Sequence, residues 1–412
     1  MTLLVALGVF TLVVWAGLAG TVIYSELKVR RLDEVAPPRA DDAPLPRLSV
    51  IVAARNEARS VEEALRSLLA IRYPDFEVIF VNDRSEDRTG EIAENLAREN
   101  GRLSVLHVEE LPDGWFGKNY ATQRGADAAA GELLLFTDGD ITFEPDAVAF
   151  GVRHLLRGGL DHLSAGPRVA VSGTLLRACT MALRLCISAT KRLWKVRDPR
   201  SSAFMGVGGY TIMRADSYRA LGGHRSVALR PDEDLRMGQL VKESGMQSEF
   251  LNGEAMIACP WYDSVGGFVH GTEKNLFAAR NYRLADSLVS AAGLSWLATA
   301  PGVLAPLLWA TGETVPAIIF TACLLTSLLP ALTVLRDDAH PWLVLVFPLA
   351  VVIVAYALLR STAIAMMRGV AWGGPPIPLS DLRAARVRPA RDGGEGNDPQ
   401  PARIFDDDAT GT

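Results

Sequence analysis

The sequence has few cysteines, few lysines and no excess of positive charge. Its four cysteines form no Cys-x-x-Cys pair, which excludes a zinc site of that type and gives no sign of a disulfide framework. The formal net charge of −5 gives no indication of a nucleic-acid partner, since such partners are usually met by a strongly basic surface. We therefore expect small, buried, reduced cysteines and no nucleic acid.

The first apolar run lacks both a basic region before it and an evident small-residue cleavage site. Segment 3–24 has about 22 residues without a charge, enough to cross a bilayer. These features favour an uncleaved anchor, residues 1–26, over a removed signal peptide. Lys28, Arg30 and Arg31 follow at once, and the positive-inside tendency then places the middle of the chain in the cytoplasm.

Three further apolar segments lie near the C-terminus, at roughly 294–311, 315–335 and 342–359. They predict a C-terminal membrane region over 286–367. If all three crossed from a cytoplasmic domain, the arginine-rich segment after them would be exported, against the positive-inside tendency. Because two prolines interrupt the first segment, we expect it to lie in the interface or to re-enter, leaving two crossings.

The region between the apolar parts is organised as one domain with a linker before it. The proline-rich segment 27–46 predicts the linker, and residues 47–285 predict an α/β domain with a mostly parallel sheet and flanking helices. Its regular half, 47–145, is expected to bind a nucleotide, and its less regular half, 146–285, an acceptor. The tail, 368–412, is expected to be largely disordered.

The regular half alternates apolar strands with amphipathic helices. In such doubly wound sheets, ligands bind outside the carboxyl ends of the strands, at the topological switch point. Ser60 and Glu63 predict a capping box at the start of the first helix. The predicted strands are 48–53, 76–81, 103–108 and 133–137.

Aspartates follow two of these strands, with Asp83 after the second and both Asp138 and Asp140 after the fourth. A divalent cation held by such carboxylates can bridge a diphosphate and neutralise its charge, and Gly139 lets the backbone turn tightly beside the ligand. An Asp-x-Asp sequence alone is usually a solvated turn. Here the apolar strand before it places it at the sheet edge, which favours a Mg²⁺ or Mn²⁺ site.

Other polar residues near this edge have two open interpretations. Asp83 either accepts a hydrogen bond from a nucleobase or only shapes the strand-to-helix turn, and the same choice holds for Asn56 and Glu57. Lys118, one of only six lysines, stands at a predicted helix start. A positive charge there opposes the helix dipole, so a diphosphate partner would explain it; a solvated lysine is the alternative.

The second half contributes a later group of acids, Asp232, Glu233 and Asp234, which open a predicted helix. The helix dipole stabilises acids at that position, and this accounts for at least one of them. A general base must lie within hydrogen-bond reach of an acceptor hydroxyl, and we choose Asp234, although sequence physics alone does not decide it. Trp261 and Tyr262 either stack on the acceptor or are buried aromatics.

Together these features resemble the membrane-associated glycosyltransferase family 2 enzymes, which have a GT-A fold. The resemblance covers roughly residues 47–285, and non-processive enzymes that glycosylate lipids, associated with hopanoids, carotenoids or ceramide, are the most similar. It implies inverting transfer of a sugar from a nucleotide-diphosphate sugar, a UDP-sugar, to a lipid or lipid-linked acceptor at the cytoplasmic face of a bacterial inner membrane. The matching segments are 50–57, 81–89, 117–121, 137–140 and 233–235, with 369–376 similar to a juxtamembrane element.

The resemblance also implies roles for individual residues. Asp83 would contact the nucleobase, Asp138 the ribose or metal, Asp140 the metal, and Asp234 would be the base. The full expected donor-binding set is Ala54, Asn56, Glu57, Asp83, Lys118 and Asp138, and the expected acceptor set is Glu233, Trp261, Arg280 and Arg283.

Two departures leave alternatives open. The Gln-x-x-Arg-Trp segment of processive polysaccharide synthases is absent, although such a synthase remains one alternative. Residues 280–284 resemble the (Gln/Arg)-x-x-Arg-Trp form of ceramide glucosyltransferases, but Leu284 replaces the tryptophan, so Arg280 and Arg283 could instead be charges on a membrane-proximal helix. The other alternative is a non-catalytic membrane scaffold or sensor; the complete set of expected acids argues against it.

Overall fold

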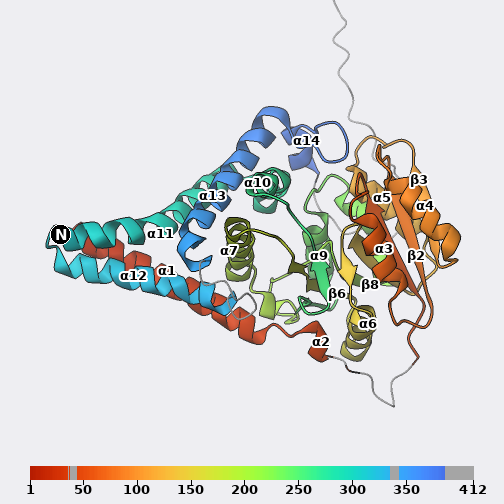
Figure 1. Ribbon diagram of the computed structural model, residues 1–412, viewed down its shortest axis with the longest axis horizontal. Helices are drawn as coiled ribbons and strands as arrows, with labels where there is room; N and C mark the ends of the chain where they lie inside the picture. The colour runs from red at the N-terminus through yellow and green to blue at the C-terminus, as the bar shows by residue number, and fades with distance from the viewer. Residues whose placement is uncertain (36, 38–43, 335–342, 386–412) are drawn as a thin grey trace, which may run out of the picture.

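The computed structural model describes residues 1–35, 37, 44–334 and 343–385, so the part of the predicted disordered tail beyond residue 385 lies outside the described residues. Figure 1 shows an α/β domain with long helices that project from one side of it. This arrangement confirms the predicted α/β fold with apolar helices from both ends of the chain.

A seven-stranded sheet forms the centre of the domain, in the order β3-β2-β1-β4-β8-β6-β9. Strands β3, β2, β1 and β4 are mutually parallel, and β6 is parallel to β9. Only β8 runs antiparallel to its neighbours, so the sheet is mostly parallel, as predicted. Its strands are β1 (Leu48–Ala54), β2 (Phe76–Asp83), β3 (Leu103–Val108), β4 (Leu133–Asp138), β6 (His162–Gly166), β8 (Thr211–Arg214) and β9 (Ser248–Asn252).

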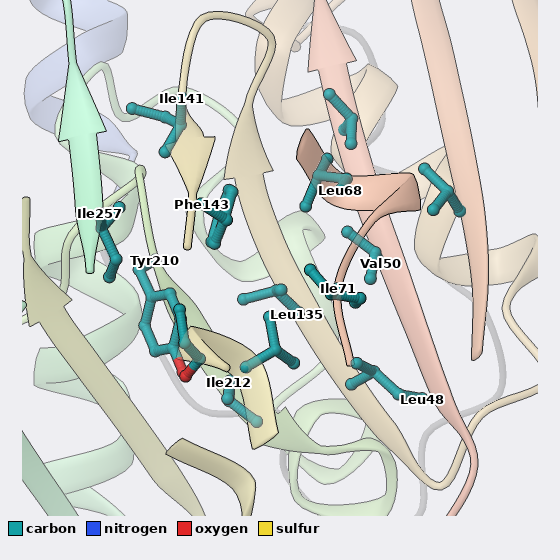
Figure 2. Close-up of a cluster of buried hydrophobic side chains, with 14 of the residues drawn as sticks. Leu48, Val50, Leu68, Ile71, Leu135, Ile141, Phe143, Tyr210, Ile212 and Ile257 are labelled. Atoms are coloured by element: carbon teal, nitrogen blue, oxygen red, sulfur yellow. The ribbon is translucent and has the colours of Figure 1, made fainter. Parts of the chain in front are cut away.

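The four strands predicted from apolar runs are confirmed, three of them continuing one or two residues further. All seven residues of β1 are buried, as expected for a central parallel strand covered on both faces. Figure 2 shows part of the resulting core, where Leu48 and Val50 of β1 lie near Leu135 of β4 and Ile212 of β8.

Helices flank the sheet, with α5 packed on β1 and β2, and α4 on β3. The predicted capping box does not form, because the Ser60 hydroxyl donates a hydrogen bond of 3.1 Å to the Glu57 carboxylate instead of capping α3. The helices are α3 (Val61–Leu69), α4 (Thr89–Glu99), α5 (Gly117–Ala128), α6 (Ala147–Gly158), α7 (Thr174–Lys191), α8 (Ala215–Ala220), α9 (Glu233–Glu243) and α10 (Val265–Thr272), with 3₁₀ turns η1 (Leu193–Lys195), η2 (Gly223–Val227) and η3 (Ala278–Arg280).

A second, three-stranded sheet lies in the less regular half, in the order β5-β10-β7. It joins the turn after β4 to the segment that precedes the aromatic residues at 261 and 262. Its strands are β5 (Thr142–Phe143), β7 (Arg168–Val169) and β10 (Ile257–Cys259).

Four long apolar helices complete the described chain: α1 (Thr2–Lys28), α11 (Leu284–Ala310), α12 (Thr314–Val334) and α13 (Leu343–Arg368). By length and composition α1, α11 and the Leu345–Arg368 part of α13 could cross a membrane, and Thr314–Pro330 of α12 is a shorter apolar helix. Figure 1 shows α1, α11 and α12 side by side, pointing away from the domain, whereas α13 runs across the domain beside α7.

Both segments that border the apolar helices fold onto the domain. After α1, the short helix α2 (Leu32–Val35) buries Leu32 completely, and the backbone of Asn252 donates a hydrogen bond to Arg30. After α13, residues 370 and 377 exchange two backbone hydrogen bonds that close a loop, and α14 (Leu379–Ala384) follows. The described part of the predicted tail is therefore ordered as far as residue 385.

Candidate active site

The central position of β1 brings the expected donor residues to one edge of the sheet. In the parallel register, Ala53 of β1 lies opposite both Val81 of β2 and Asp138 of β4. The carboxyl ends of these strands therefore meet at the same edge. This edge presents Ala54, Asn56, Glu57, Asp83 and Asp138, all predicted from the sequence.

Gly139 is required by a close approach between two of these strand ends. A β-carbon at Gly139 would lie 2.6 Å from the β-carbon of Ala54, closer than side-chain atoms can pack. The predicted tight turn is therefore enforced by packing against Ala54, and it places Asp138 and Asp140 on either side of that contact.

Lys118 forms the electrostatic centre of the site. Its ammonium group lies 2.5 Å from Asp138 and 2.9 Å from Glu233, and thereby links the two halves of the domain. Burial disfavours the charged lysine, but the neighbouring carboxylates outweigh burial and hold the pKa of Lys118 well above its ordinary value. The solvated-lysine interpretation is therefore wrong.

Gly208 marks the point where Lys118, Asp138 and Asp234 converge. A β-carbon at Gly208 would lie 3.0 Å from Lys118 Nζ, 3.1 Å from Asp138 Oδ2 and 3.6 Å from Asp234 Oδ2. Two backbone N–H groups hold the Asp234 carboxylate: Gly208 donates to Oδ2 and Leu235 to Oδ1, both at 2.7 Å.

The two acids at the start of α9 have different surroundings. Burial raises the pKa of Glu233 to about 7, although its contact with Lys118 opposes the rise. Burial also raises the pKa of Asp234, opposed by Lys118 and by its two backbone donors. Asp234 remains partly exposed, whereas Glu233 is 4% exposed. Asp234 is therefore the more exposed of the two acids.

Asp140 belongs to a concentration of negative charge. Burial, together with the negative charges of Asp138 and Glu57, raises the pKa of Asp140 to about 7. Within the described residues, no three acidic, cysteine or histidine side chains are close enough to hold a metal ion by themselves. The group nevertheless fits a Mg²⁺-type cation, which commonly takes one or two carboxylates and completes its shell with substrate phosphates and water.

Asp83 lies at the other end of this edge and is 3% exposed. Burial raises its pKa, while Arg84, 2.7 Å away, and Arg55 oppose the rise. Both arginines also donate hydrogen bonds to the backbone carbonyl of Gly373, Arg84 at 2.6 Å. The loop that follows α13 therefore lies directly over Asp83.

The same loop delivers Trp372 to the site. Its ring centroid lies 4.2 Å from Lys274 Nζ, 5.6 Å from Lys118 Nζ and 6.0 Å from the ring of Phe116. The loop after α13 thus reaches the same site as Lys118 and Lys274, although it lies far from both in the sequence.

Other residues predicted from the sequence lie at the margin of the site or outside it. The side chain of Asn56 accepts a hydrogen bond of 2.8 Å from the backbone of Glu86, which supports its interpretation as a turn residue. Arg280 donates to Ser290, and Arg283 pairs with Asp286 at 3.4 Å. These contacts tie both arginines to α11.

Trp261 is 39% exposed and stacks on Tyr262, with ring centroids 5.1 Å apart. The Tyr262 ring packs edge-on against Phe268, and Asp140 is among the charges that raise the pKa of Tyr262, after burial. Tyr262 is thus a packed aromatic, whereas Trp261 offers an exposed ring that stacks on it.

With the geometry established, comparison with known proteins identifies the domain. Residues 49–222 match the family described as Glycosyl transferase family 2. The chain carries a glycosyltransferase family 2 domain. This glycosyltransferase domain contains the whole strand edge from Ala54 to Asp140, together with Lys118 and Gly208.

Curated relatives of the glycosyltransferase domain are 4,4'-diaponeurosporenoate glycosyltransferases of Staphylococcus aureus. The protein of strain bovine RF122 / ET3-1 is 25% identical over 232 residues, which cover 56% of this chain and 60% of the relative. The protein of strain USA300 is 25% identical over 217 residues, covering 52% and 56%. The chain therefore matches only part of the length of these relatives.

Among solved structures, the mannosyltransferase PcManGT from Pyrobaculum calidifontis, in complex with GDP-Man and Mn²⁺, is similar with a TM-score of 0.52 and 17% sequence identity. The match covers 88% of this chain and 99% of that chain. This likeness supports the GT-A-like fold of the glycosyltransferase domain and its flanking helices.

Sequence reasoning missed several residues that contact the expected site, namely Arg55, Arg84, Gly208, Lys274 and Trp372. Lys274 had one available signal, since it is one of only six lysines. Trp372 lies within the segment 369–376, whose similarity to a juxtamembrane element was apparent, but nothing in that segment indicated contact with Lys118.

Proposed function

We propose that this protein is an inverting glycosyltransferase that moves a sugar from a nucleotide-diphosphate sugar, a UDP-sugar, to a lipid or lipid-linked acceptor. One observation carries the proposal: Lys118, Asp138 and Asp234 surround the single position of Gly208. The carboxylate proposed to hold the metal ion, the lysine that pairs with it and the potential base thereby face one another across a space of a few ångströms.

The strand edge is the proposed donor site. Asp83 would accept a hydrogen bond from the nucleobase, and Ala54 and Glu57 would line the nucleotide. Asp138 and Asp140 would hold Mg²⁺ or Mn²⁺, because their mutual repulsion is relieved by a divalent cation. When bound, such a cation neutralises the charge that develops on the departing diphosphate.

Asp234 is the proposed general base. Its raised pKa makes it a stronger proton acceptor than an ordinary aspartate, and the N–H groups of Gly208 and Leu235 fix its orientation. It would take the proton from an acceptor hydroxyl as the hydroxyl oxygen attacks the anomeric carbon opposite the leaving diphosphate. A single displacement of this kind inverts the anomeric configuration.

Several residues are candidates for acceptor contacts. The exposed ring of Trp261 suits an apolar or sugar-bearing acceptor, and Glu233 lies next to the base. Arg280 and Arg283, tied to the start of α11, would contact the acceptor only where it enters beside the apolar helices. The S. aureus relatives, named for diaponeurosporenoate, support a lipid-like acceptor.

The apolar helices support a membrane location with the domain on the cytoplasmic side of a bacterial membrane. The start of α13, Leu343, belongs to the same buried cluster as Val22, near the domain end of α1. The end of α13 leads into the loop over Asp83, so both its ends lie beside the domain. We therefore assign crossings to α1, α11 and α12, and place α13 along the membrane surface, in place of the re-entrant 294–311 expected from the sequence.

This assignment also removes the conflict with the positive-inside tendency. With an α11–α12 hairpin and no crossing by α13, the arginines after α13 stay on the same side as Lys28 and Arg30.

The proposed function is tested by incubating the purified protein with Mn²⁺, a panel of nucleotide sugars and a total lipid extract. A lipid product heavier by one sugar residue, with the inverted anomeric configuration, is expected with one donor class. A polymeric product would indicate a processive synthase, and absence of both transfer and donor hydrolysis would contradict an enzymatic function.

A further inference from the structure

Lys118, the lysine first expected to bind the diphosphate, already has two carboxylate partners. Its contacts with Asp138 and Glu233 balance its charge within the protein. To bind a donor phosphate as well, Lys118 would have to divide its N–H donors between the phosphate and these two carboxylates. A second basic residue could therefore act beside the metal ion, where negative charge develops on the leaving group.

Lys274 has the properties that this position requires. It lies between α10 and η3, and its ammonium group sits over the ring of Trp372 at 4.2 Å. Among the described residues it has no carboxylate within 4.0 Å. Its charge interacts with Lys118, Glu233, Asp138 and Asp234, so it faces the same site.

A mostly buried ammonium group without a carboxylate partner is unfavourable in the free protein. Burial, together with repulsion from Lys118, lowers the pKa of Lys274 to about 8. The face of Trp372 offsets part of this cost but offers no hydrogen-bond acceptor. The ammonium donors of Lys274 are therefore available to an anion in the site.

We propose that Lys274 is a donor-binding residue that contacts the diphosphate of the nucleotide sugar, and that Trp372 is a positioning residue that holds its ammonium group. The inference rests on the proposed function and adds a residue to it. As the bond between the anomeric carbon and the diphosphate oxygen breaks, its electron pair remains on that oxygen. The acceptor proton passes to Asp234, and Lys274 donates a hydrogen bond to the diphosphate.

The role of Trp372 also links the donor site to the membrane helices. Trp372 stands four residues after Arg368, the last residue of α13, and is separated from it by Gly369, Val370 and Ala371. The loop is closed by the hydrogen bonds between residues 370 and 377. A displacement of this loop would move the ring away from both lysines.

The test compares binding of nucleoside diphosphates and monophosphates to the full-length protein in detergent with Mn²⁺. Calorimetry with UDP, GDP, UMP and GMP is carried out on the wild type, Lys274→Met, Lys274→Gln and Lys274→Arg. We expect the two neutral variants to bind the preferred diphosphate roughly tenfold to hundredfold more weakly, as for loss of a charged hydrogen bond. Binding of the monophosphate should change much less, and the arginine variant should retain most of the affinity.

Thermal unfolding separates this role from a structural one. Because Lys274 is buried without a carboxylate partner, its neutral variants should unfold at the same or a higher temperature without ligand. Trp372→Leu should weaken diphosphate binding in the same direction but less, while Lys195→Met, an exposed lysine away from the site, should change nothing.

The outcomes distinguish two failures. If the wild type binds a diphosphate and Lys274→Met binds it equally well, or if both nucleotide classes weaken by the same factor, the assignment of Lys274 is overturned and the proposed function survives. If the wild type binds no nucleoside diphosphate, the proposed function itself is overturned.

Discussion

The carboxylate of Asp234 accepts a hydrogen bond of 2.7 Å from the backbone N–H of Gly208. This contact joins the start of α9 to the segment before β8 and fixes the acid opposite Lys118. Because it is made by a backbone group, it survives side-chain substitution at Gly208. The space around Gly208, however, depends on the absence of a β-carbon.

Gly208→Ala should therefore reduce turnover without unfolding the protein. The added methyl group would lie about 3 Å from the Lys118 ammonium group and the Asp138 carboxylate, and displacing either by about 1 Å costs roughly a hundredfold in rate. Sugar transfer and thermal unfolding are measured together. Gly101→Ala, where a β-carbon would meet nothing within 4 Å, is the control; equal activity of both variants would contradict the account.

Gly373→Ala should weaken donor binding. Gly373 has a φ of +66°, which an alanine adopts at a cost of about 1 kcal/mol, and its carbonyl accepts hydrogen bonds from Arg55 and Arg84 over Asp83. Gly245→Ala is the matched control, since Gly245 has a φ of +75° and nothing within 4 Å of a β-carbon. Both variants should lose similar stability, but only Gly373→Ala should lose nucleotide affinity.

The domain should lose stability in acid because burial lowers the pKa of two of its histidines. Burial lowers the pKa of His162 to about 4 and that of His224 to about 3, whereas an unfolded histidine titrates near 6.5. Between these values the unfolded chain binds more protons, so stability falls as pH decreases from about 6.5 to 4, by up to about 1.4 kcal/mol per pH unit for each histidine.

Unfolding temperatures from pH 7.5 to 4.5 measure this slope. His162→Phe should make it shallower, and a slope unchanged by the substitution would show that other groups control the acid sensitivity.

The helix assignment predicts which loops are accessible from outside the cell. In a background without the four native cysteines, Thr311→Cys, at the turn between α11 and α12, should react with a membrane-impermeant maleimide on intact cells. Asp381→Cys, exposed on α14, should react only after lysis. Protection of residue 311 would instead support the re-entrant arrangement of segment 294–311.

The sequence allowed the sheet edge to be predicted because its signals are local. Apolar runs of strand length end one residue short of Asp83 and Asp138, with Asn82 and Thr137 in between, and parallel strands bring their carboxyl ends together. The choice of Asp234 over Glu233 needed the resemblance to a family, and the structure adds a physical reason, since Glu233 is buried against Lys118.

Lys274 and Trp372 could not be placed in the same way. Their proximity depends on how α10 and α13 pack beside the domain, which no periodic pattern encodes. The failed capping box at Ser60 has a similar cause, because its hydroxyl is bound by Glu57, a neighbour drawn to the sheet edge. Local signals therefore predicted the strand edge, but not the contacts made by the loop after α13.

The role of Asp234 as the base is tested by sugar transfer with Asp234→Asn, measured as labelled lipid product per protein that binds nucleotide. Asparagine keeps the size and the acceptor oxygen of the side chain but cannot take a proton at neutral pH. We expect a loss of at least about a hundredfold in transfer, with nucleotide affinity within a few-fold of the wild type. Unchanged transfer would contradict this role.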